Sequence, residues 1–213
     1  MGRAVALLRA VNVGGRTATK AQLTAALAAA GLTGVSTFLA SGNVLFDVPP
    51  AASTSPTALT VGISPASSPA SGSDPDPQPD GQPWSEAERA ALELRIEGRL
   101  QAALGFAVVT FVRSDTEMAA LAAADPFATA DPSVARQVAF LKTPATPAAR
   151  AAVGSLSTDR DTLVVAGQEL WWLARDGVGR SALKPGALDT AAGQPVTARN
   201  VTTVRRLAAL LHP

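Results

Sequence analysis

The sequence contains no cysteine and only one histidine, so it lacks most of the side chains that carry chemistry near neutral pH. Without cysteine there is no disulfide, no thiolate nucleophile and no thiolate metal ligand. The one histidine, His212, is the penultimate residue, where chain ends fray. A Ser-His-Asp triad and a His-based zinc site are therefore not expected. We expect no metal and no cofactor, and the sequence names no catalytic residue.

Long apolar runs are also absent. No stretch reaches the ~18 apolar residues of a membrane helix, and the first residues lack the regions of a signal peptide. We therefore expect a cytoplasmic protein with no membrane partner. Aromatic content is only 4% and the formal net charge is +1, which argues against an extensive nucleic-acid surface. The chain is nevertheless mildly basic from Arg175 onward.

One segment has a composition unlike the rest of the chain. Residues 49–84 consist almost wholly of Pro, Ser, Ala, Thr, Gly and Asp, and they lack spaced large apolar residues. Such a segment cannot offset the entropy of ordering its backbone, so we predict a disordered insertion. Leu59, Val61 and Ile63 alternate as in a strand, but the flanking prolines argue against one.

The residues around this insertion predict six elements in the order β-α-β-β-α-β. Thr19 and Gln22 have the spacing of a capping box, as have Ser85 and Glu88, and each pair predicts a helix start. Short apolar runs bounded by Gly and Asn predict strands and a hairpin turn at 40–43. The predicted strands are 4–11, 35–39, 44–48 and 106–113, and a short helix follows from Ser114.

The second part of the chain repeats this order. Thr146-Pro147 predicts a helix start, and Gly167-Gln168 predicts a second hairpin turn. The remaining predicted elements are strands at 136–142, 163–165 and 170–174, a helix near 181–188, an extended piece at 195–197 and a last helix burying Val201, Val204, Leu207 and Leu211. The predicted fold is α+β, with two ferredoxin-like βαββαβ halves and a C-terminal helix. We place the halves at residues 1–125 and 134–213.

Two side-chain pairs carry further expectations. Trp171 and Trp172 are neighbours on a predicted strand, so one indole should point into the core and the other outward. The outward indole could stack on a nucleic-acid base or pack between the halves. Glu93 and Glu97 belong to an amphipathic helix pattern, and we expect both carboxylates to face solvent.

Four motifs gather Gly, Asn, Ser and Arg at the ends of predicted strands. They are Leu-Leu-Arg-Ala-Val-Asn-Val-Gly-Gly at 7–15, Ser-Gly-Asn-Val-Leu-Phe at 41–46, Gly-Val-Gly-Arg-Ser at 177–181 and Thr-Ala-Arg-Asn-Val-Thr-Thr-Val at 197–204. In this order they resemble the bacterial family called domain of unknown function 1697, from residue 4 to about 211 outside the insertion. The resemblance implies a duplicated ferredoxin-like fold in a small cytoplasmic protein, with no established activity.

The family pattern marks a set of candidate ligand-binding residues. These are Arg9, Asn12, Gly14, Gly15, Ser41, Gly42, Asn43, Arg180, Ser181, Arg199 and Asn200. Arginine forks suit carboxylates and phosphates, and glycine-rich turns can present backbone N–H groups to an anion. Our leading hypothesis is binding of a small phosphate-bearing ligand, such as a nucleotide, or of a nucleic-acid backbone.

Two other interpretations of these motifs stay open. In the first, the protein is a hydrolase or transferase in which Ser41 or Ser181 acts as nucleophile and Arg and Asn side chains stabilise an oxyanion. In the second, the motifs are purely structural and lock the two halves together. The sequence does not specify an oligomeric state.

Overall fold

The computed structural model describes residues 2–39, 42–48, 84–128 and 130–212. The predicted insertion, except Trp84, lies outside the described residues, as does the motif residue Ser41. The first half contains β1 (Arg3–Leu8), α1 (Lys20–Ala29), β2 (Thr33–Phe38), β3 (Asn43–Asp47), α2 (Glu86–Leu104) and β4 (Thr110–Ser114), and α3 (Asp115–Ala123) follows it. The predicted capping boxes at Thr19 and Ser85 are confirmed, and a third begins α3 at Ser114.

The second half repeats the element order of the first. It contains β5 (Ala135–Leu141), α4 (Pro147–Gly154), β6 (Asp161–Ala166), β7 (Glu169–Ala174), the short 3-10 helix η1 (Val178–Arg180), α5 (Ala187–Ala192) and β8 (Val196–Asn200), and α6 (Val201–Leu211) follows it. Both four-stranded sheets are antiparallel, with orders β2-β3-β1-β4 and β6-β7-β5-β8. Two ferredoxin-like halves are therefore confirmed. β4 and β8 are equivalent edge strands, each followed directly by a helix.

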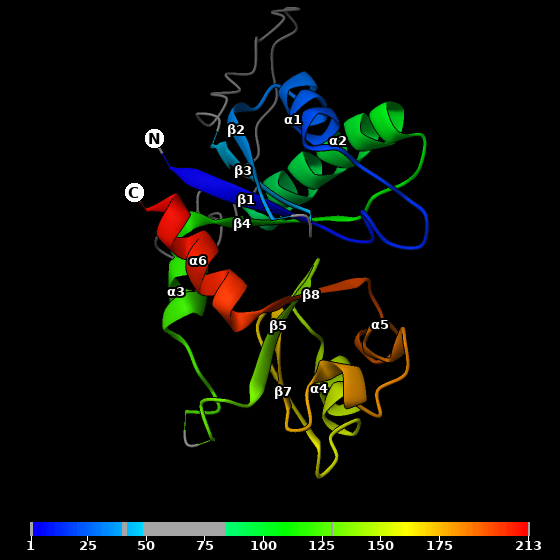
Figure 1. Ribbon diagram of the computed structural model, residues 1–213, viewed down its shortest axis with the longest axis vertical. Coiled ribbons are helices and arrows are strands. Elements are labelled where there is room, and N and C mark those ends of the chain that lie inside the picture. The colour runs from blue at the N-terminus through cyan, green and yellow to red at the C-terminus, as the bar shows by residue number, and fades with distance from the viewer. Residues whose placement is uncertain (1, 40–41, 49–83, 129, 213) are drawn as a thin grey trace, which may run out of the picture.

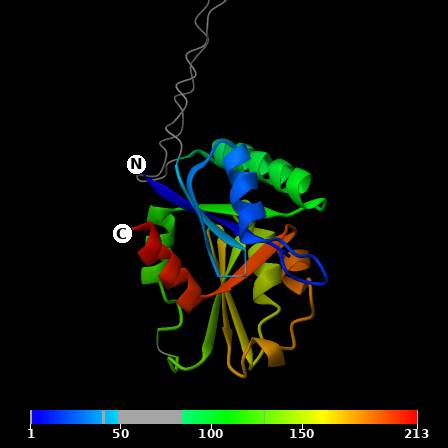
Figure 2. The same cartoon turned by 45° about the horizontal axis from the view of Figure 1, so that its top comes forward.

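The two sheets face each other, with helices on their outer sides (Figure 1). One core lies between the first sheet and α1 and α2, and another lies between the second sheet and α4 and α5. The third core joins the halves, because Leu7 and Phe111 of the first sheet pack with Phe140 and Trp171 of the second. α3 and α6 pack side by side and close one flank of this shared core (Figure 2).

The second half departs from the prediction at one helix. We expected a helix near 181–188, but the chain forms η1 and then a separate six-residue helix, α5. Pro185 disfavours a helical conformation at Lys184, and Gly186 adopts a positive φ of 79° as the N-cap of α5. In the first half, the strand predicted at 106–113 begins only at Thr110.

Packing between the halves, one of the two alternatives given for the outward tryptophan, is confirmed. Trp171 and Trp172 point to opposite faces of β7, as alternation requires, but both are buried, with 3% and 7% exposure. Trp171 belongs to the core between the sheets, and Trp172 packs beneath α4 and α5. Because both faces of β7 are covered, alternation leaves neither indole as a stacking platform. No helix among the described residues is long and apolar enough to cross a membrane.

Candidate functional site

Arg199 and Asn43, which are far apart in the sequence, meet where the two halves join. Nε of Arg199 donates to Oδ1 of Asn43 at 2.6 Å, and Nη2 donates to the carbonyl oxygens of Leu8 at 2.8 Å and Gly42 at 3.4 Å. Asn43 is fully buried, and its Nδ2 donates to the carbonyl oxygen of Phe38 at 2.9 Å. One arginine of the second half therefore holds the end of β1 and the β2–β3 turn.

The guanidinium of Arg199 is saturated with neutral acceptors. Nη1 donates to Thr197 Oγ1 and to the carbonyl oxygen of Ala198, both at 2.9 Å, so all five N–H donors are used. No carboxylate among the described residues forms an ion pair with it. Because the side chain is 7% exposed, burial lowers the pKa of Arg199 to about 10.

Arg113 makes the equivalent contacts in the opposite direction. Nε donates to Glu169 Oε1 at 2.8 Å, Nη1 to the carbonyl oxygen of Val112 at 2.8 Å, and Nη2 to those of Leu141 at 2.8 Å and Gln168 at 3.3 Å. Like Arg199 it is buried, with 0% exposure. An arginine of the first half therefore holds the end of β5 and the β6–β7 turn.

Sequence reasoning missed this second arginine, although a signal was present. Arg113 and Arg199 each come directly before the N-cap residue of the helix that follows an edge strand, Ser114 for α3 and Asn200 for α6. The strand registers match as well, because Leu8 pairs with Thr110 as Leu141 pairs with Val196. Asn43 in the first half corresponds to Glu169 in the second, which gives only Arg113 a charged partner.

Lys142 and two glutamates of α2 cover the edge of the first sheet at β4. Nζ of Lys142 lies 2.8 Å from Glu93 and 2.7 Å from Glu97. Glu97 accepts the backbone N–H of Thr110, and Glu93 accepts that of Val112, both at 2.8 Å. The expectation that these carboxylates face solvent is wrong, since Glu93 is only 2% exposed. The outward N–H groups of an edge strand need acceptors, and α2 supplies them.

Arg9 is the counterpart of Lys142, because each is the residue after the first strand of its half. Arg9 forms a two-pronged ion pair with Asp189 of α5, in which Nη2 lies 3.1 Å from Oδ2 and Nη1 contacts Oδ1. Asp189 also accepts the backbone N–H of Val196 at 2.7 Å. Arg9 thus has one carboxylate partner where Lys142 has two, and its pair is more exposed.

The loop after β1 fixes the entry to α1 and packs on the β2–β3 turn. Asn12 adopts a positive φ of 60°, and its Oδ1 accepts the backbone N–H of Ala18 at 2.8 Å, which fixes the entry to α1. Gly14 and Gly15 also have positive φ and are exposed. Gly42 instead lies in a tight position, where an added Cβ would meet a methyl carbon of Val11 at 2.3 Å.

The late motifs contain an exposed arginine, a serine that bonds within a turn and an asparagine that caps a helix. Arg180 is exposed, and no side-chain hydrogen bond or ion pair joins it to another described residue. Ser181 Oγ donates to Asp161 at 2.9 Å and accepts the N–H of Leu183 at 3.0 Å. Asn200 caps α6 through the N–H of Thr202 at 2.8 Å. Among the described motif residues, Gly42, Asn43 and Arg199 are thus brought together, whereas Ser181 and Asn200 make their contacts elsewhere.

A pocket of about 260 Å³ lies between the η1–α5 segment and the edge of β8. Apolar side chains line most of it, including Val178, Leu183 and Leu188. Asp189, Val196 and Ala198 also line it, so the pocket borders the strand edge that Arg9 and Asp189 partly cover. Val178 of the motif at 177–181 therefore lines this pocket, and Arg9 is linked to it through its ion pair with Asp189.

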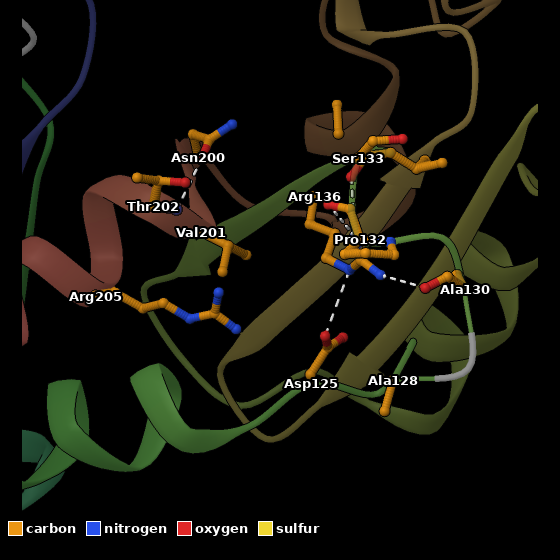
Figure 3. A pocket seen from close by; sticks show the side chains of 12 residues that line it. Asp125, Ala128, Ala130, Pro132, Ser133, Arg136, Asn200, Val201, Thr202 and Arg205 are labelled. Atoms are coloured by element: carbon orange, nitrogen blue, oxygen red, sulfur yellow. Dashed lines mark hydrogen bonds and ion pairs between the residues drawn. The ribbon is translucent and has the colours of Figure 1, made fainter.

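A second pocket, of about 480 Å³, lies at the start of α6 (Figure 3). Arg205 extends from α6 toward Arg136 and Asp125, and Asn200 lies at its rim. Arg136 already donates to a group of backbone carbonyl oxygens between Phe127 and Val134 and lies 3.4 Å from Asp125. Its charge is thus largely committed to holding this loop. No group of acidic and histidine side chains suited to a metal ion occurs among the described residues.

Comparison with known proteins agrees with this architecture. Residues 1–72 and 84–171 match the family described as protein of unknown function DUF1697. The chain belongs to this family. The motifs at 177–181 and 197–204 lie beyond the matched residues. Among curated proteins no match was found.

One solved structure has a similar fold along the entire chain. It is the conserved bacterial protein SP0830 from Streptococcus pneumoniae, with a TM-score of 0.64 and 17% sequence identity, covering 100% of this chain and 99% of that chain. At this identity the likeness supports the fold alone.

Proposed function

We propose that the protein binds a small anion at the edge of β8, beside Arg9. The observation that supports this is the difference between the two equivalent edges. In the first half, Glu93 and Glu97 both accept outward N–H groups of β4 and share Lys142. In the second half, Asp189 is the one carboxylate of the described residues that accepts an outward N–H of β8 and pairs with Arg9.

The backbone N–H of Ala198 corresponds to that of Val112. Both residues lie two positions after the first residue of their edge strand, and in both the carbonyl oxygen accepts Nη1 of the neighbouring arginine. Outward groups alternate along a strand, so Ala198 points its N–H away from β5, as Val196 does. Within the described part of the chain this N–H has no acceptor, and Ala198 is exposed.

The charge around this edge favours a negative ligand. Arg180 and Lys184 are both exposed on the segment that forms one wall of the adjacent pocket. α5 has six residues and α2 has nineteen, so α5 offers no second carboxylate over the strand. An anion that accepts the Ala198 N–H near Arg9 would therefore replace water with a charged acceptor.

Amide NMR of the full chain tests this proposal at low ionic strength. Inorganic phosphate, acetate and a nucleoside monophosphate are titrated separately, and at least one should shift the Ala198 amide in a saturable way. Arg9→Gln should weaken this binding by about tenfold, because it removes one charge-assisted contact. Arg9→Lys should retain most of it, and Arg95→Gln on the exposed side of α2 is the matched control. Absence of a saturable Ala198 shift with all three anions would reject the proposal.

For Gly42, Asn43 and Arg199 we propose a structural function, namely locking the halves together. The specific observation is that all five guanidinium donors of Arg199 are used within the protein. Its side chain therefore has no donor left for a ligand. Arg199→Met should lower the melting temperature and leave anion affinity within about twofold of wild type, a change of ~0.4 kcal/mol or less. If Arg199→Met remains folded but loses anion affinity, Arg199 takes part in binding and the structural proposal is wrong.

A further inference from the structure

We propose that the anion is a monocarboxylate with a small apolar body, whose carboxylate contacts the Ala198 N–H and Arg9 while its body enters the pocket beside β8. This inference rests on the proposed function and names the class of ligand. Its template is internal to the protein, because the first half already places one carboxylate, that of Glu93, in the equivalent position.

Glu93 shows what the equivalent position accepts. One carboxylate oxygen accepts the Val112 N–H at 2.8 Å, and the other lies 2.8 Å from Nζ of Lys142. The second half supplies the same two partners in Ala198 and Arg9. A planar group with two oxygens satisfies one backbone donor and one cation at once, so a carboxylate has the required shape.

Local charge favours one negative charge over two. Arg9 is already paired with Asp189, whose carboxylate borders the pocket. A phosphate dianion would place two charges near that carboxylate, whereas a monoanion places one and can be balanced by Lys184 on the pocket wall. Like-charge repulsion therefore selects against phosphate at this edge.

The pocket supplies the apolar part of the site. Trp172, Leu183 and Leu188 line it together with Val178, which is 40% exposed and leaves the lining accessible from solvent. Its volume of about 260 Å³ is below the ~300–1,000 Å³ of pockets for drug-sized molecules. A body of a few carbon atoms is therefore the expected size.

The test compares acetate, hexanoate and inorganic phosphate by amide NMR on the full chain. Both carboxylates should shift the Ala198 amide, and only hexanoate should also shift Leu183 and Trp172. Hexanoate should bind at least about tenfold more tightly than acetate, since its extra methylene groups leave water. Phosphate should bind more weakly than hexanoate.

Two matched variants separate the apolar pocket from the anion contact. Val178→Trp should fill the pocket and weaken hexanoate about tenfold, with acetate unchanged. Val164→Trp on β6, at a residue of similar exposure (38% against 40%), should change neither. If hexanoate binds no better than acetate, or phosphate binds best, this inference is wrong while the anion site stands. If no anion shifts Ala198, the proposed function fails as well.

Discussion

The first half of the molecule completes its own sheet edge, whereas the second half leaves the equivalent edge partly open. β4 has two carboxylates from α2 over its outward N–H groups, and these share Lys142. Over β8 the described part of the chain places only Asp189, which is paired with Arg9. The two halves have the same topology, so the difference arises from the length of one helix and the position of its acidic residues. Duplication thus gives an internal reference for what the open edge can bind.

The buried arginines show the same contrast between a charged and a neutral environment. Arg113 has Glu169 as an ion-pair partner, and Arg199 has Asn43 in the corresponding place. Neutral acceptors satisfy the donors of Arg199 but leave its charge without a counter-ion, which is why burial lowers its pKa. Each arginine donates hydrogen bonds from one half to backbone carbonyl oxygens of the other. Together, Arg113 and Arg199 therefore connect the two halves in both directions.

The largest expected effect is the loss of stability on replacing Arg113, compared with the loss on replacing Arg199. Arg113→Met should lower the free energy of unfolding by ~3–5 kcal/mol, because it leaves the Glu169 carboxylate without its partner. Arg199→Met should cost less, ~1–3 kcal/mol, since it leaves only neutral acceptors unpaired. Urea unfolding monitored by tryptophan fluorescence measures both. A greater loss of stability for Arg199→Met would show that the ion pair of Arg113 with Glu169 does not make this contact the stronger one.

A comparison of Gly42 with Gly31 tests how tightly the β2–β3 turn is packed. Gly42→Ala should destabilise the protein by ~2–4 kcal/mol, because the residue has a positive φ of 74° and its new Cβ would collide with Val11. Gly31 has a similar φ of 80° but open space around it, so Gly31→Ala should cost only ~1–2 kcal/mol. Thermal unfolding of the two variants gives the difference, and equal losses would show that packing at the β2–β3 turn contributes little.

The smallest expected effect is the contribution of Glu93 to the pH dependence of stability. Burial raises the pKa of Glu93 above its ordinary value of 4.5, although Lys142 opposes the shift. The folded state therefore holds this proton more tightly than the unfolded state, and stability falls as pH rises through the window just above 4.5. Glu93→Gln keeps an oxygen acceptor for the Val112 N–H, but its amide does not titrate in this pH range. Urea unfolding from pH 4 to 7 should show wild type losing stability relative to the variant as pH rises, and a constant difference would contradict the assignment.

Most of the fold was predictable because it depends on local signals. Capping residues at Thr19, Ser85 and Ser114 begin three helices, and apolar periodicity gives the core of α6. The single helix expected near 181–188 is wrong, because Pro185 and Gly186 interrupt helical geometry between η1 and α5. The correct structure of this segment therefore also follows from local residues, namely Pro185 and Gly186.

The site was less predictable, because its contacts join residues far apart in the chain. The sequence marked Arg199 and Asn43, but nothing local shows that each would satisfy the other inside the protein. Glu93 and Glu97 follow a helical pattern typical of a solvent-facing side, and only the edge of β4 explains their burial. The open N–H of Ala198 is visible only by comparing two halves whose sequences are not evidently alike.

Amide hydrogen exchange at Val112 and Ala198 tests the central contrast most directly. The Val112 amide, bound by Glu93, should be protected, and the equivalent Ala198 amide should exchange far more rapidly in the free protein. Saturating hexanoate should slow Ala198 and leave Val112 unchanged. Equal protection of the two amides in the free protein, or an Ala198 rate that does not respond to the ligand, would contradict the account.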